Sequence, residues 1–167
     1  MKPGHKLALL AAAFTTLGIA MGGYLFADTQ PRSFIAFHRC ESCLRPADLA
    51  GLLASVGILK TPYLIPGIVM ETDKTFVIRH PQPAAPIHYV LIPKKDIKDV
   101  ADISTNDSEY LIDLFATVGA LVRREGLVHY RVYSNGPGYQ HVRYLHFHLI
   151  ASRRRSPRLP IGAGNES

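Results

Sequence analysis

The pattern of apolar and polar positions first sets apart a long apolar run near the start of the chain. Residues 7–27 contain no charged side chain, and about twenty apolar residues are enough for a helix to cross a bilayer. A cleaved secretory signal has a shorter apolar centre and a small-x-small cleavage site, which Leu25-Phe26-Ala27 matches poorly. We therefore expect residues 1–27 to form an N-terminal transmembrane anchor (or an uncleaved signal).

The charges beside this run indicate its orientation. Lys2 and Lys6 precede it, and positive residues favour the cytoplasmic side of a membrane. This predicts a single-pass protein of the inner or plasma membrane, with a cytoplasmic N-terminus and the folded domain on the extracytoplasmic (periplasmic) side.

The rest of the chain alternates between strand-like and helical patterns. Five runs are typical of strands, namely residues 65–72, 75–79, 87–92, 128–134 and 143–151. Residues 106–125 have apolar side chains at helical spacing, and Asn106 with Glu109 forms a capping-box start. A shorter helix is expected from Pro46 to Val56, ending at Gly57. This order predicts an α+β domain, in which an antiparallel sheet of about five strands carries one long helix on one face.

Composition and charge divide the chain further. We expect residues 28–65 to be a linker with a CxxC motif and the short helix, residues 66–152 the folded domain, and residues 153–167 a basic, disordered tail. The net charge of +6 favours anionic partners such as phosphorylated metabolites or lipid headgroups. No nucleic-acid-binding motif accompanies this charge, so a nucleic-acid partner is not expected.

Candidate chemistry is concentrated in residues 140–150. His146 and His148 lie two residues apart in a strand-like run, so we expect them to share one face of the strand with Tyr144. The run follows a Gly/Pro loop, residues 135–140, whose backbone can approach a ligand closely. Neutral imidazoles in this place suit a metal or a phosphate ester. A core strand that carries two hydrogen-bonded histidines is the structural alternative.

Two segments, with the long helix between them, resemble the histidine triad (HIT) superfamily. They are HPQPAAPIHYVLIPKK at residues 80–95 and NGPGYQHVRYLHFHLIA at residues 135–151. The resemblance covers residues 66–152 and is closest to the nucleotide-binding branch of purine nucleoside phosphoramidases and dinucleoside polyphosphate hydrolases. It implies a HIT-like antiparallel sheet with a helix across it, and a homodimer whose sheets meet edge to edge.

The resemblance also implies catalytic roles. The family motif H-x-H-x-H here reads Tyr144-Leu-His146-Phe-His148. His146 takes the place of the middle histidine, which in the family attacks an α-phosphate to form a nucleotidyl-histidine intermediate. A neutral imidazole suits that role. His148 would position the phosphate, and Gln140 would contact the phosphate and the leaving or attacking oxygen. Tyr144 keeps a ring and a hydrogen-bonding tip at the first position, as a candidate substrate contact.

Further positions are expected to bind the substrate. Asn135 and the amides around Gly136 and Gly138 would line a cradle for the phosphate. His80 matches the family position that packs against the nucleobase. The acidic residue that follows it in the family, and binds ribose hydroxyls, is replaced by Pro81. The resemblance therefore leaves nucleoside recognition open.

Cys40 and Cys43 form a single CxxC motif. Such a pair fits half a zinc site, a redox pair or a local disulfide. Zinc-containing relatives place a ligand at the position of His88, while Tyr144 occupies the fourth ligand position. The alternatives are therefore a structural zinc held by Cys40, Cys43 and His88, or a Cys40–Cys43 disulfide. The implied reaction requires no cofactor.

The resemblance and the apolar run together imply a membrane-tethered HIT-family hydrolase or nucleotidyl transferase. It would cleave a phosphoanhydride or phosphoramidate bond of a nucleotide or nucleotide-linked small molecule through a phosphohistidine at His146. Two alternatives stay open. One is a non-catalytic HIT domain that binds a nucleotide or anion, which Tyr144 and Pro81 favour. The other is a lipid pyrophosphatase of the CDP-diacylglycerol type, which the anchor favours.

Overall fold

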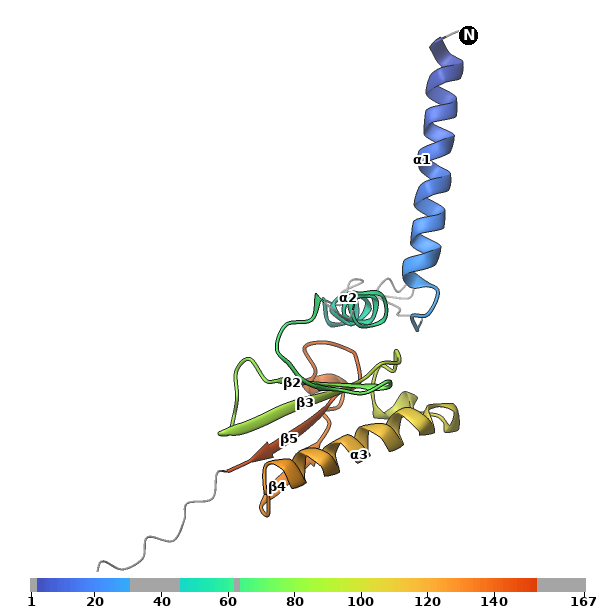
Figure 1. Cartoon of the computed structure of the whole chain (residues 1–167). Coiled ribbons are helices and arrows are strands. Elements are labelled where there is room, and N and C mark those ends of the chain that lie inside the picture. The colour runs from blue at the N-terminus through green and yellow to red at the C-terminus, as the bar shows by residue number, and fades with distance from the viewer. Residues whose placement is uncertain (1–2, 31–45, 62–63, 153–167) are drawn as a thin grey trace, which may run out of the picture.

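Five antiparallel strands form one sheet in the order β1-β2-β3-β5-β4. The computed structural model describes residues 3–30, 46–61 and 64–152. Its strands are β1 (Ile68–Glu71), β2 (Thr75–Arg79), β3 (Ile87–Pro93), β4 (Tyr130–Tyr133) and β5 (Phe147–Ala151). Its α-helices are α1 (Pro3–Phe26), α2 (Pro46–Lys60) and α3 (Ser108–Arg124). Figure 1 shows α3 along one face of the sheet and α2 on the other side. The predicted α+β architecture, with its antiparallel sheet and long helix, is confirmed.

Alternation along the strands divides the sheet into two faces. On one face, strand residues pack against the apolar stripe of α3. The buried members of this core are Val77, Tyr89, Leu91, Leu114, Val118, Leu121 and Leu149. On the other face, Ile58 of α2 packs with Phe76 of β2 and with Tyr144. Both faces of the central strands are therefore covered in part, and the uncovered part of the second face is left for the candidate site.

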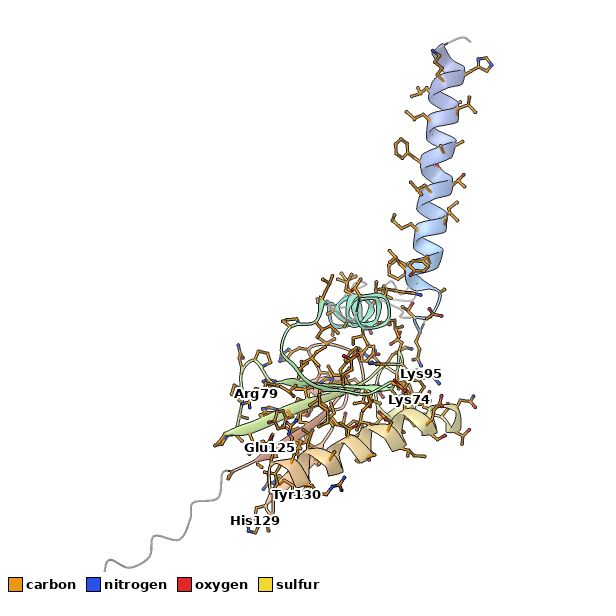
Figure 2. The ribbon with its side chains drawn as sticks, in the orientation of Figure 1. Lys74, Arg79, Lys95, Glu125, His129 and Tyr130 are labelled. Carbon is orange, nitrogen blue, oxygen red and sulfur yellow. The ribbon has the colours of Figure 1, made fainter. Side chains whose placement is uncertain are left out.

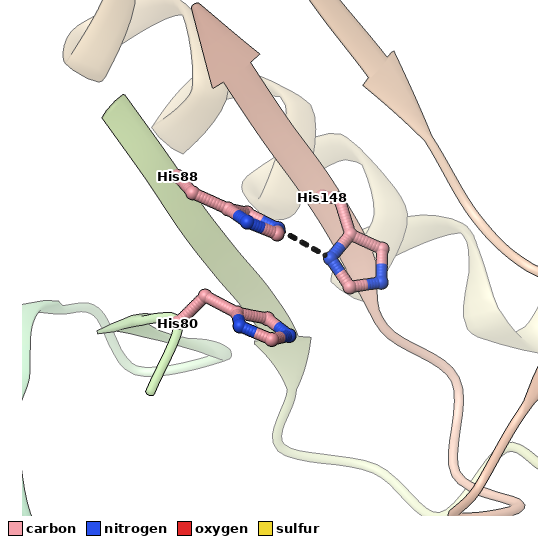
Figure 3. A group of neighbouring side chains, drawn as sticks. All are labelled: His80, His88 and His148. Atoms are coloured by element: carbon pink, nitrogen blue, oxygen red, sulfur yellow. Dashed lines mark hydrogen bonds between the residues drawn. The ribbon is translucent and has the colours of Figure 1, made fainter. Parts of the chain in front are cut away.

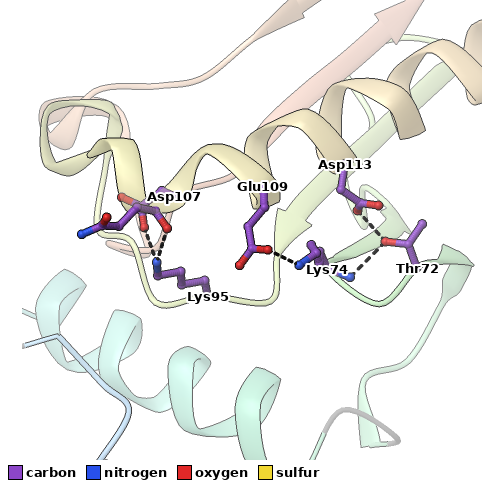
Figure 4. Close-up of polar contacts among 7 residues, drawn as sticks. Thr72, Lys74, Lys95, Asp107, Glu109 and Asp113 are labelled. Carbon is purple, nitrogen blue, oxygen red and sulfur yellow. Dashed lines mark hydrogen bonds and ion pairs between the residues drawn. The ribbon is translucent and has the colours of Figure 1, made fainter.

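Polar contacts fix α3 at both of its ends. Near its start, Lys95 pairs with Asp107 at 2.7 Å and Lys74 pairs with Glu109 at 2.6 Å, which fastens the helix to the loops that follow β3 and β1 (Figure 4). Near its end, the Tyr89 hydroxyl donates to Glu125 Oε1 at 2.9 Å, and Figure 2 shows Arg79 and Glu125 at this end of the sheet. Gly126, with φ 62°, then follows the end of the helix.

Several element boundaries differ from the sequence prediction, since α3 begins at Ser108, β1 begins at Ile68 and β4 spans Tyr130–Tyr133. The predicted capping box of Asn106 and Glu109 is wrong, because Ser104 and Asp107 form the capping box just before α3. The predicted end of the short helix at Gly57 is wrong, because α2 continues to Lys60 and the Gly57 carbonyl accepts a hydrogen bond from the Thr61 amide at 3.0 Å. Strand β5 begins at Phe147, later than predicted. The backbone before it is bonded elsewhere, since the amides of Arg143 and Leu145 donate to the carbonyls of Ala47 and Ile97.

Helix α1 extends away from the rest of the structure (Figure 1). Residues His5–Phe26 are long and apolar enough to cross a membrane, with mean hydropathy 1.7 over the most apolar window, and no part of that window is buried. An N-terminal signal sequence meets the same criterion. The helix therefore gives weak support to either a membrane span or a signal.

Candidate active site

Three histidines from three positions of the chain meet on the face of the sheet that carries Phe76. His80 directly follows β2, His88 lies in β3 and His148 lies in β5. The register pairs Val90 with His148, so His88 and His148 are diagonal neighbours on one face. The His80 and His88 rings stack with centroids 4.2 Å apart, and Figure 3 shows the tilted His148 ring beside this pair.

Hydrogen bonds fix the protonation of this cluster. The backbone amide of Ala84 donates to His88 Nδ1 at 3.1 Å, so in the neutral ring the proton must be on Nε2. His88 Nε2 lies 2.9 Å from His148 Nδ1, and it therefore donates there. His148 must then carry its own proton on Nε2, a buried nitrogen that has no partner among the described residues. The site thus holds a buried N–H donor without a partner among the described residues, and such a donor suits an anionic oxygen.

His146 has the opposite arrangement. Its Nδ1 lies 2.7 Å from the carbonyl oxygen of Tyr144, and a carbonyl can only accept, so Nδ1 carries the proton. The Nε2 atom is left with a lone pair. The His146 ring meets the His148 ring edge to face, with centroids 5.0 Å apart. A ring nitrogen that can attack therefore lies beside one that can donate.

Burial keeps these rings neutral. Desolvation lowers the pKa of His146, against the hydrogen bond to Tyr144 that raises it. The pKa of His148 is lowered to about 4, first by burial and then by the charges of His146, His88 and His80. Burial, followed by the proximity of His80, also lowers the pKa of His88. At neutral pH His88, His146 and His148 are therefore uncharged, and the Nε2 lone pair of His146 is available.

The Gly/Pro loop supplies a further polar group. Gln140 is buried, and its Nε2 donates to the Asn135 carbonyl at 2.7 Å. Its Oε1 is buried and has no partner among the described residues, so its capacity as an acceptor is unused. Gly136 and Gly138 lie in the exposed part of this loop, around the short helix Pro137–Tyr139. The loop predicted to form the cradle is therefore anchored by Gln140.

Tyr133 belongs to this site, although no local sequence pattern predicts it there. Its ring stacks on His148 with centroids 4.9 Å apart and an interplanar angle of 20°, because β4 pairs with β5 with Tyr133 opposite His148. The register of these two strands was the signal that would have found it. Tyr144, in contrast, is buried with Ile58, and its hydroxyl donates to the Pro93 carbonyl at 2.8 Å. The structure does not bring Tyr144 into the histidine cluster.

The residues around His88 do not fit a zinc ligand. A metal-bound histidine normally uses its second nitrogen as a donor, whereas His88 Nδ1 accepts from Ala84 and Nε2 donates to His148. The three histidines have ring nitrogens within 4.8 Å of one another, but His80 Nδ1 likewise accepts, from the Gln82 amide at 3.0 Å. Cys40 and Cys43 lie outside the described residues.

Comparison with known proteins agrees with this geometry. The sequence family described as "Scavenger mRNA decapping enzyme C-term binding" matches residues 65–160. An uncharacterized HIT-like protein of Synechococcus elongatus is 38% identical over 89 residues, which are 52% of this chain and 78% of that protein. The chain belongs to this family and to the HIT superfamily. Adenylylsulfatase HINT1 of Arabidopsis thaliana is 34% identical over 94 residues, which cover 52% of this chain and 63% of that protein.

Solved structures show the same HIT fold. A HIT family hydrolase from Legionella pneumophila superposes with a TM-score of 0.53 at 32% identity, covering 63% of this chain and 96% of that one. A HIT family hydrolase from Clostridium thermocellum gives a TM-score of 0.52 at 25% identity, covering 70% of this chain and 98% of that one. The uncovered part of this chain is therefore an addition to a nearly complete HIT domain.

Proposed function

We propose that this protein is a membrane-tethered HIT-family hydrolase or nucleotidyl transferase. It cleaves a phosphoanhydride or phosphoramidate bond of a nucleotide or nucleotide-linked small molecule through a covalent phosphohistidine at His146. The observation that carries the proposal is the hydrogen bond from His146 Nδ1 to the Tyr144 carbonyl, which leaves Nε2 as a neutral nucleophile. The names of the similar hydrolases and of the adenylylsulfatase support the same class of reaction.

The reaction proceeds in two displacements. The Nε2 lone pair of His146 attacks the α-phosphorus, and the P–O or P–N bond to the leaving group breaks. The leaving group departs with the electron pair and takes a proton from solvent. Water then attacks the same phosphorus and loses a proton, and the N–P electron pair returns to His146. His148 Nε2–H stabilises the charge on a non-bridging oxygen in both steps, and Gln140 Oε1 orients the water.

The remaining residues of the site bind the substrate in this proposal. Asn135, Gly136 and Gly138 cradle the phosphate, and His80 packs against the nucleobase. Residues 66–152 carry the activity, and α1 holds them at the extracytoplasmic side of the membrane. A homodimer is expected from the family resemblance, with the exposed edge strand β4 as its interface.

A trapping experiment tests the proposal. The full-length protein in detergent is mixed with α-labelled adenosine phosphoramidate, a dinucleoside polyphosphate or CDP-diacylglycerol, and is then quenched in alkali, because phosphohistidine is labile to acid. We expect label on histidine in the wild type and none in His146→Ala, with His141→Ala as the matched control that keeps the label. Label retained by His146→Ala contradicts the assignment. Absence of label with every substrate supports the non-catalytic alternative, and label from CDP-diacylglycerol alone supports the lipid pyrophosphatase.

The proposed reaction uses no cofactor, because protein groups supply the nucleophile and the donor. A structural zinc at Cys40 and Cys43 is a separate proposal, which metal analysis of the purified protein tests. Zinc that is lost in Cys40→Ser and kept in His88→Phe would place the metal at the cysteines without His88. Zinc lost equally in both variants would contradict the hydrogen-bonding role of His88.

A further inference from the structure

We propose that the outer face of α2 lies on the surface of the bilayer that α1 enters, so that the HIT domain is docked on the lipid and not merely tethered to it. The partner is a lipid surface. The inference rests on the proposed membrane tether, and it adds a second contact with the membrane at a defined place in the fold.

Helix α2 has an inner and an outer face of different character. The inner face is buried in the domain and comprises Asp48, Gly51, Ser55 and Ile58. The outer face carries Leu49 and Leu53, which are 37% and 60% exposed, and Leu64 just beyond the helix is 67% exposed. A leucine surface of this kind is costly in water at about 25 cal/mol per Å² of apolar area. Exposed apolar patches of this kind mark a binding surface.

The charges of α2 favour lipid as the partner. The helix has two ionisable side chains, Asp48 and Lys60. Asp48 is turned inward and pairs with Arg143, so no acidic group of α2 faces outward to repel an anionic headgroup. An interfacial helix usually needs a polar face for the side that is away from the lipid. In α2 the side away from the lipid packs on the protein instead. This helix therefore needs no polar face, and its outer face can be apolar.

The junction with α1 places this face at the end of the apolar helix. Lys60, the last residue of α2, pairs with Asp28 at 2.7 Å and lies 4.5 Å from the centre of the Tyr24 ring. The amide of Gln30 also donates to Asp96 Oδ2 at 2.6 Å. Tyrosine and lysine at the end of a span are the residues that anchor it at the headgroup level. Figure 1 shows α1 leaving on the side of α2 and running away from the sheet, so α2 lies where the bilayer surface would be.

Docking through α2 also determines which way the candidate site faces. Ile58 of α2 packs on Phe76, and the register places Phe76 opposite Ile92 and His148 opposite Val90. Since Val90 and Ile92 point to the same side of β3, His148 is on the face of the sheet that α2 covers. Docking therefore turns the histidine-bearing face toward the membrane, beside the lipid-facing helix.

Tryptophan fluorescence provides the test, because the chain has no native tryptophan. Three single-tryptophan variants of the full-length protein are placed in nanodiscs of phosphatidylcholine and phosphatidylglycerol, with and without brominated acyl chains that quench by contact. Leu53→Trp reports on α2, and Leu17→Trp reports on α1. Ile112→Trp is the matched control, since Ile112 is 69% exposed on α3 at the opposite face of the sheet.

We expect bromolipid to quench Leu53→Trp and Leu17→Trp and to leave Ile112→Trp unchanged, with the Leu53→Trp emission shifted to the blue. If Leu17→Trp is quenched and Leu53→Trp behaves like Ile112→Trp, the domain is tethered but not docked, and the inference is wrong. A blue-shifted Leu53→Trp without quenching means that protein covers α2, which also overturns it. No quenching of Leu17→Trp removes the tether and the docking together, and leaves the chemistry at His146 unaffected.

Discussion

Nε2 of His88 lies 2.9 Å from Nδ1 of His148, and this contact determines which nitrogen of His148 is free to donate. Because the Ala84 amide donates to the other nitrogen of His88, the position of the proton on each ring is fixed. His88 carries its proton on Nε2, and His148 carries its proton on its own Nε2. His148 is thereby a donor before any substrate arrives, and it needs no rearrangement of protons to bind an anionic oxygen.

Replacing His88 with phenylalanine should remove the hydrogen bond that fixes the tautomer of His148. His148 would then be free to adopt the other tautomer and present an acceptor to the phosphate. Removal of one donor to a developing oxyanion costs on the order of 10²-fold in kcat, and we expect a loss of that size with little change in KM. Single-turnover kinetics of His146 labelling measure it. His88→Gln is the control, because its amide can accept from Ala84 and donate to His148. Equal losses in both variants would show that the hydrogen bonds of His88 are not what matters.

Stability should depend on pH through His148. An unfolded histidine takes up its proton near pH 6.5, whereas folded His148 does so only at about 4. Between these values the unfolded state binds more protons, so the free energy of unfolding decreases as the pH is lowered through this window. Thermal unfolding followed by circular dichroism at neutral pH and at about pH 5 should show a lower midpoint in acid. His148→Gln should have a weaker pH dependence, and an unchanged one would assign the effect to other groups.

Pro81 should limit the recognition of ribose. In the family an acidic residue at this position binds the ribose hydroxyls, and Pro81 has no such acceptor. A hydrogen bond to a charged group contributes about 1.5–3 kcal/mol, so Pro81→Asp should raise kcat/KM about tenfold for adenosine phosphoramidate over its 2′,3′-dideoxy analogue. Pro81→Ala serves as the control and should not change this ratio. An unchanged ratio in Pro81→Asp would mean that nucleosides bind in another way.

Arg143 should be important for stability. It pairs with Asp48 at 3.1 Å and with Asp99 at 3.3 Å, and the side chains of both aspartates are at most 6% exposed. Arg143→Met leaves these two carboxylates without their cation, which should lower the free energy of unfolding by about 3 kcal/mol. The control is Arg124→Met, which removes an exposed pair with Glu125 and should cost less than about 1 kcal/mol. Urea unfolding in detergent measures both, and equal costs would contradict a special role for Arg143.

Local patterns predicted much of this architecture, because strand alternation and the apolar stripe of α3 are properties of neighbouring residues. The position of His88 could not be predicted in this way. Its neighbour His148 lies 60 residues away in sequence, and the two meet through the register of β3 with β5, which no local pattern specifies. Strand alternation was also the basis for placing Tyr144 on the same face as His146. The contacts of its neighbours with Ala47 and Ile97 interrupt the alternation just before β5.

Arg143 also joins α2 to the segment just before β5. Its side chain holds Asp48 and its amide holds the Ala47 carbonyl, both in the first turn of α2, and three residues later the chain reaches His146. The chain segment that carries His146 is therefore held partly by α2, which precedes the sheet. A shortened chain that starts at β1 would keep every histidine of the cluster. It would still lose the contacts of Arg143 with α2, which help to position the attacking nitrogen of His146.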